Sequence, residues 1–130
     1  MAVNETRMMG EHESYHKTIT GEEAEERLRQ HGGHCYLTRY SRMKECYVLS
    51  VFEHQKPLNP EIDHFEIVVE SDGKHRINGK SMAFNSIHQL LEYYEQNRIN
   101  PAFKSIGTMY TEEDYITSNE SKSGMACTIL

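Results

Sequence analysis

The stretch Gly33–Arg42, GHCYLTRYSR, contains a strand whose apolar face ends in a positive charge. Cys35 and Leu37 recur at the two-residue period of a half-buried β-strand. The same period places Arg39 and Ser41 on that face as well. Because a guanidinium group keeps its proton, a desolvated one needs a carboxylate, carbonyl groups or a bound anion as its partner. The end of this strand is therefore a candidate ligand site.

A helix is predicted before this strand, over ITGEEAEERLRQHGG, residues 19–33. Thr20 and Glu23 form a capping box at its start, and Gly32 suits the left-handed conformation that ends many helices. A second helix is predicted over NSIHQLLEYYEQN, residues 85–97. Its apolar side chains with helical spacing are Ile87, Leu90, Leu91 and Tyr94.

The remaining periodic segments are predicted strands at 35–40, 46–53 and 64–70, with short strand pieces near 76–78 and 82–84. About five residues join the first two strands, which predicts an antiparallel hairpin. This order of elements predicts an α+β fold, a central antiparallel β-sheet flanked by two α-helices. We expect one domain over residues 14–110, after a flexible lead of residues 1–13 and before a disordered, acidic and Ser/Thr-rich tail of residues 111–130.

Charge, composition and motifs argue against nucleic-acid binding, membrane spanning, metal binding and catalysis. The formal net charge is −6 and the acidic residues cluster, so nucleic acid is not expected as a partner. No signal peptide is recognisable, and no apolar run approaches the roughly 18 residues of a membrane span, so a cytoplasmic monomer is expected. No cofactor or metal is predicted, because the histidines of HGGHC, residues 31–35, flank a helix stop and lack a second ligand pair. No arrangement of catalytic side chains is recognisable, so an enzyme is not expected.

The residues after the apolar strand have the chemistry of a phosphate site. Arg39 offers a planar fork of donors, and Ser41 offers a hydroxyl on the same strand face. The short turn that follows supplies backbone N–H groups together with Arg42 and Lys44. An internal salt bridge of Arg39, for example with Glu66, is the structural alternative.

Five collinear stretches resemble the Src homology 2 (SH2) family. HCYLTRYS resembles the F-L-V-R-E-S strand of that family, and ITGEEAEERL resembles its first helix. CYVLSVF resembles the next strand, DHFEIV the K-H-Y-K-I strand, and FNSIHQLLEYY the F-x-S-L-x-x-L-v-x-Y-Y helix. The resemblance runs in order from Tyr15 to about Tyr110.

The resemblance implies a module that binds tyrosine-phosphorylated proteins through two sockets, one on each side of the sheet. The socket for phosphotyrosine would be formed by Arg39, Ser41, Arg42, Lys44 and His64. The second socket would accept an apolar residue three positions after the phosphotyrosine. Its predicted residues are Phe65, Ile77, Gly79 and Tyr94.

Two departures from the family pattern concern customary cations. Gly21 stands where many members have an arginine, and Glu66 stands where a lysine or arginine is common. A divergent module with weak or no phosphate dependence is therefore an alternative. We expect a stand-alone adaptor, since the chain starts with Met1 and ends in a polar tail. An SH2 fragment of a multidomain signalling enzyme is the other alternative.

The tail carries candidate modification sites. Tyr110 and Tyr115 lie among acidic residues and are candidate phosphorylation sites. The alternative is a solvated tail, with Tyr110 packed as the last residue of the domain. The last four residues, CTIL, match a prenylation box at Cys127 and also resemble a carboxy-terminal ligand for an edge-strand binding groove. An unmodified end is the third reading. Association with a membrane is expected only if Cys127 is prenylated.

Overall fold

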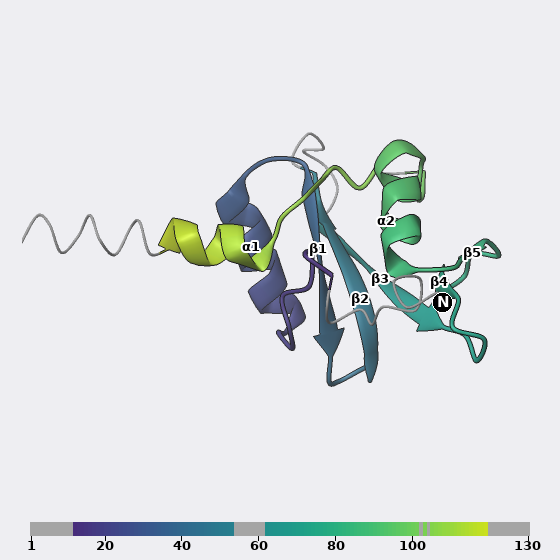
Figure 1. Ribbon diagram of the computed structural model, residues 1–130. Helices are drawn as coiled ribbons and strands as arrows, with labels where there is room; N and C mark the ends of the chain where they lie inside the picture. Colours follow the sequence, from purple (N-terminus) through teal and green to yellow (C-terminus); the bar gives the residue numbers. More distant parts are fainter. Residues whose placement is uncertain (1–11, 54–61, 102, 104, 120–130) are drawn as a thin grey trace, which may run out of the picture.

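The computed structural model describes residues 12–53, 62–101, 103 and 105–119 (Figure 1). In chain order the elements are α1 (Gly21–His31), β1 (Cys35–Ser41), β2 (Cys46–Phe52), β3 (Ile62–Val69), β4 (His75–Ile77), β5 (Ala83–Phe84), α2 (Ile87–Gln96) and β6 (Thr108–Met109). Figure 1 shows α1 and α2 on opposite sides of the sheet. The predicted α+β fold with a central sheet between two helices is confirmed. Within the described residues no helix is long and apolar enough to cross a bilayer.

The sheet has the strand order β5-β4-β3-β2-β1-β6. Strands β1 to β5 pair antiparallel with their neighbours in sequence, as predicted. Strand β6 corrects the expectation of a purely antiparallel sheet, because it pairs in parallel with β1 through Cys35 and Tyr36. The sequence predicted only a loop there, since a two-residue strand is too short to show a period.

Strand β1 separates two cores. Leu37 packs with Ala24 and Leu28 of α1 on one side of the sheet. Tyr36 points to the other side, where it joins the α2 core and its hydroxyl donates to Glu95 Oε2 at 2.6 Å. The period of two then places Arg39 on the α1 side. The strand thus carries its charged end toward the start of α1.

The outer edge of β1 is shared by segments from both ends of the described chain. Beyond β6, the segment 14–17 continues the edge, because Thr38 N–H donates to Ser14 O at 2.9 Å and His16 N–H donates to Thr38 O at 2.8 Å. The His16 ring joins the two segments, since its Nε2–H donates to Tyr110 O at 2.7 Å. These bonds satisfy backbone groups that an uncovered edge strand would expose.

The tail prediction is wrong for residues 112–119, which form a helix beside α1 (Figure 1). Lys17 Nζ lies 2.7 Å from Glu112 Oε1, and the Arg27 guanidinium lies 4.0 Å from the centre of the Tyr115 ring. A charge pair and a cation–π contact therefore hold this helix against the domain. Residues 120–130, and with them the predicted prenylation of Cys127, lie outside the described residues.

A capping signal could have revealed the tail helix. Asp114 N–H donates to Thr111 Oγ1 at 2.9 Å, which makes Thr111 the N-cap. The acidic residues that follow it lie in the first turn, where the helix dipole favours negative charge. The acidic composition of the segment, which suggested disorder, is therefore compatible with a docked helix.

The buried ring of His16 makes stability depend on pH. Burial lowers the pKa of His16 below its ordinary value of 6.5, and Nδ1 accepts a hydrogen bond from Arg27. Below about pH 6.5 His16 binds a proton in the unfolded chain but not in the folded chain. The free energy of unfolding therefore falls as the pH falls. The melting temperature is expected to decrease from pH 7.5 to pH 5.

Thermal melts of histidine variants test whether His16 causes this pH dependence of the melting temperature. His16→Gln is expected to flatten the slope of melting temperature against pH. His88, whose side chain is 71% exposed, provides the matched control, and His88→Gln should keep the slope of the unmodified chain. Burial also lowers the pKa of His75, so a smaller slope of the same sign should remain in the His16 variant. An unchanged slope in His16→Gln would contradict the assignment.

Candidate functional site

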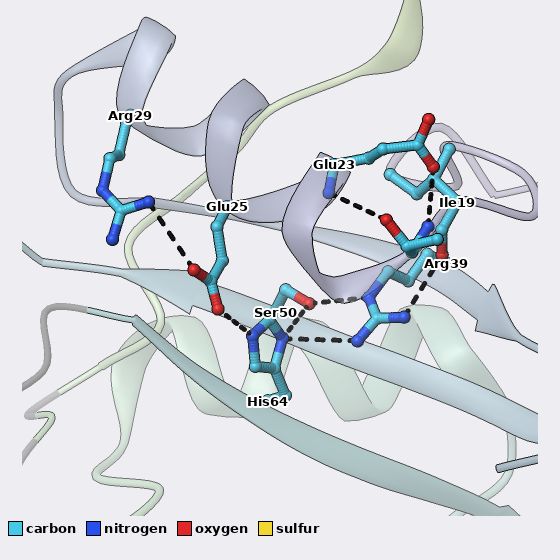
Figure 2. A network of polar contacts seen from close by, with 8 residues as sticks. Ile19, Glu23, Glu25, Arg29, Arg39, Ser50 and His64 are labelled. Atoms are coloured by element: carbon cyan, nitrogen blue, oxygen red, sulfur yellow. Dashed lines mark hydrogen bonds and ion pairs between the residues drawn. The ribbon is translucent and has the colours of Figure 1, made fainter. Parts of the chain in front are cut away.

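Arg39 is a buried cation near the end of β1, with 5% of its surface exposed. Its Nε–H donates to Ser50 Oγ at 3.2 Å and its Nη1–H donates to Ile19 O at 3.3 Å. Its Nη2–H donates to His64 Nδ1 at 3.4 Å (Figure 2). Burial lowers the pKa of Arg39, because a desolvated charge is costly. Within the described residues no carboxylate forms an ion pair with this guanidinium.

The predicted alternative of a salt bridge between Arg39 and Glu66 is therefore wrong. Both residues align with Val48 in the sheet, so they lie in one row, with the intervening strand β2 between them. Glu66 Oε2 instead lies 3.2 Å from Lys44 Nζ in the turn between β1 and β2. No direct pair forms between the two side chains, because Glu66 is engaged by Lys44 and the guanidinium is engaged by Ser50, Ile19 and His64.

The register of the sheet explains the neighbours of Arg39. Ser50 and His64 lie opposite each other on β2 and β3. They occupy the row next to that of Arg39, on the α1 side of the sheet, within diagonal reach of a long side chain. Ser50 was missed by the sequence analysis, although a serine inside the apolar run CYVLSVF marks a polar position on a buried face.

An open pocket of about 670 Å³ lies over Arg39, between the start of α1 and the turn after β1. Its lining residues are Thr18, Ile19, Thr20, Gly21, Arg39, Ser41, Arg42, Met43 and Lys44. Of the predicted phosphate site, Arg39, Ser41, Arg42 and Lys44 are thus brought together. His64 is outside the lining and contacts the guanidinium instead.

The rim of the pocket is formed by the turn after β1 and by the first residue of α1. Ser41 Oγ accepts from Lys44 N–H at 3.1 Å, which folds the turn back on the strand end. A Cβ atom added to Gly21 would lie 3.5 Å from Arg39 Nη2, at ordinary contact distance. Gly21 therefore leaves the space above the guanidinium open, whereas a longer side chain would extend into or across it.

The cations near the pocket differ in how strongly they are engaged. Lys44 is paired with Glu66, and Lys17 is paired with Glu112 of the tail helix. Arg42 is exposed, and none of the described acidic side chains forms an ion pair with it. Because exposed pairs contribute only about 0–1 kcal/mol each, a phosphate group can compete with Glu66 for Lys44.

The residues predicted for a second socket lie on the α2 side of the sheet. Ile77 and Tyr94 are buried in the core cluster there, and Phe65 packs against that cluster. Gly79 follows β4 with a φ of +91° and has open space at its Cβ position. The residues predicted for the phosphotyrosine socket and those predicted for the second socket thus lie on opposite faces of the sheet. That the residues on the α2 side form a socket for an apolar peptide residue stays a prediction.

The two tyrosines predicted as phosphorylation sites have different surroundings. Tyr110 is 4% exposed and belongs to the α1 core, so a kinase cannot reach it in the folded chain and that prediction is wrong for this state. Tyr115 is half-buried under Arg27, and its phosphorylation stays a prediction.

The fold thus places a buried arginine at a pocket beside the start of α1, on a sheet that two helices flank. A family model described as the SH2 domain matches residues 15–94. The chain is also 32% identical over 87 residues to the mouse (Mus musculus) SH2 domain-containing protein 2A, and the match covers 67% of this chain and 22% of that protein. The chain therefore belongs to the SH2 domain family, whose members are phosphotyrosine-peptide-binding modules of signalling proteins.

Proposed function

We propose that this chain is a cytoplasmic, monomeric adaptor without catalytic activity that docks onto tyrosine-phosphorylated proteins. The observation that carries the proposal is the buried guanidinium of Arg39, which lines an open pocket without a carboxylate in direct contact in the described structure. Phosphotyrosine brings a charge of roughly −1.5 to −2 at neutral pH and three acceptor oxygens. It supplies the partner that the cation lacks.

The geometry suits a phosphate at the end of a long, rigid side chain. A guanidinium has five N–H donors, and three of those of Arg39 are used by Ser50, Ile19 and His64. The other two remain for phosphate oxygens, with the Ser41 hydroxyl and the turn amides beside them. Since Arg39 is 5% exposed, we expect phosphotyrosine to reach it and the shorter phosphoserine to fall short.

Calorimetry on the full chain tests the proposal. A peptide selected from an oriented phosphotyrosine library is titrated in three forms, with phosphotyrosine, unmodified tyrosine or phosphoserine at the same position. We expect binding of the phosphotyrosine form only. Equal affinity for the unmodified tyrosine form would refute phosphate dependence.

A divergent module with weak phosphate dependence is the second candidate. The pairing of Lys44 with Glu66 favours it, because an acidic residue then engages a cation that the phosphate would use. Gly21 also favours this candidate, since it provides no charge at the start of α1. The same titration separates the two candidates, because only the divergent module binds the unmodified peptide.

A further inference from the structure

Arg39 is linked to a carboxylate on α1 through the ring of His64. Glu25 Oε2 lies 2.9 Å from His64 Nε2, and His64 Nδ1 lies 2.8 Å from Ser50 Oγ (Figure 2). Ser50 and His64 both contact Arg39, so the four side chains form a continuous chain of hydrogen bonds from β1 through β2 and β3 to α1. Glu25 was not among the residues predicted for the site.

The direction of each hydrogen bond in this chain follows from its two ends. An ionised carboxylate only accepts, so His64 carries a proton on Nε2 and donates it to Glu25. A guanidinium only donates, so the 3.4 Å contact between Arg39 Nη2 and His64 Nδ1 is a hydrogen bond in the tautomer whose Nδ1 is an acceptor. In the same tautomer Ser50 Oγ, which accepts from Arg39 Nε–H, donates its own hydrogen to Nδ1. Every donor points from the cation toward the anion.

We propose that Glu25 is a positioning residue of the phosphate site and the remote counter-charge of Arg39. It fixes the Nε2–H tautomer of His64, and that tautomer keeps Nδ1 as the acceptor that orients Ser50 and Arg39. This inference rests on the proposed function, which it extends to a residue of α1 that does not line the pocket. Arg29 Nη1, 3.6 Å from Glu25 Oε1, steadies the carboxylate from its other side.

A remote counter-charge suits a binding site better than a direct one. A carboxylate in contact with Arg39 would occupy the fork that the phosphate needs, and the ligand would have to displace it. The chain of hydrogen bonds through Ser50 and His64 instead uses the Nε–H of the guanidinium and one Nη2–H. These bonds hold Arg39 in place and leave N–H groups on its outer side for a ligand.

Two opposite effects of Glu25 make the inference testable. As a nearby negative charge, Glu25 weakens the binding of a phosphate dianion, so its removal would tighten binding. As a positioning residue it strengthens binding, so its removal would weaken it. Glu25→Ala removes the charge and the acceptor, whereas Glu25→Gln removes the charge and keeps an acceptor oxygen. Glu26→Ala is the matched control, because Glu26 is exposed on the same helix.

The first measurement is the tautomer of His64, read from the ¹⁵N chemical shifts of its ring by NMR on the full chain without ligand. We expect the Nε2–H tautomer in the unmodified chain, in Glu25→Gln and in Glu26→Ala. Glu25→Ala should give a mixture of tautomers. A pure Nε2–H tautomer in Glu25→Ala would overturn the inference, since the sheet alone would then fix the ring.

The second measurement is the affinity of the same variants for the library-selected phosphotyrosine peptide by calorimetry. Glu25→Ala is expected to bind roughly two- to tenfold more weakly, the equivalent of one net hydrogen bond. Glu25→Gln should restore affinity to within about twofold of the unmodified chain, because one acceptor oxygen suffices to hold the Nε2–H. Equal or tighter binding by Glu25→Ala overturns the inference. If the unmodified chain binds no phosphopeptide, the proposed function fails, and the tautomer measurement alone decides whether Glu25 orients His64.

Discussion

The Arg39→Lys variant is expected to lose useful affinity for phosphotyrosine peptides. Lysine keeps the positive charge but lacks the planar fork and the Nε–H that donates to Ser50. Loss of a member of a buried, hydrogen-bonded charge pair costs about 2 to 5 kcal/mol. At about 1.4 kcal/mol for each factor of ten, this corresponds to a roughly 30-fold to several thousand-fold weaker affinity, measured by calorimetry.

The control for this prediction is Arg42→Lys on the rim of the same pocket. Arg42 is exposed, so its exchange for lysine should change the affinity by no more than about threefold. Circular dichroism melts of both variants establish that each is folded. Unchanged phosphopeptide affinity in a folded Arg39→Lys variant would exclude Arg39 as the phosphate ligand and remove the basis of the proposed function.

The second large effect is expected for stability, in the Gly107→Ala variant. Gly107 has a φ of +86°, and a Cβ atom there would clash with the backbone oxygen of His34. The obstacle is backbone next to β1, which cannot rotate away as a side chain could. Strain at positive φ contributes about 1 to 3 kcal/mol, and the clash adds to it, so we expect a loss of about 3 kcal/mol or more. The melting temperature of a domain of this size should fall by more than about 10 °C.

Gly73→Ala isolates the clash from the backbone strain. Gly73 has a φ of +91°, but nothing lies within 4 Å of its Cβ position. It should therefore lose only the strain contribution, about 1 to 3 kcal/mol. Equal losses in the two variants, measured by urea unfolding, would show that the contact between the Gly107 turn and His34 is not tight in solution.

Local sequence signals were sufficient for the main elements. The capping box of Thr20 and Glu23 is present at the start of α1, as predicted. The apolar residues predicted for the second helix are buried in α2, and Ser86 is its N-cap. These signals are reliable because capping and periodicity depend on side chains within a few positions of one another.

Short elements and docked segments were beyond local signals. Strand β6 has two residues, and its pairing with β1 depends on a turn at Gly107 that fits against His34. The helix of residues 112–119 is acidic and largely exposed, so its composition suggested a tail, whereas contacts with Lys17 and Arg27 hold it beside α1. Such contacts join residues that are distant along the chain, and composition does not record them.

Local sequence patterns were enough to predict the fold class, the family and the arginine at the end of the apolar face of β1. The surroundings of that arginine became visible in the folded chain: Glu66 is engaged by Lys44, whereas Ser50, His64 and Glu25 form the chain that orients Arg39. The physical reason is the range of the interactions. Periodicity acts over a few residues, but the partners of a buried charge are set by strand register and by how α1 lies on the sheet.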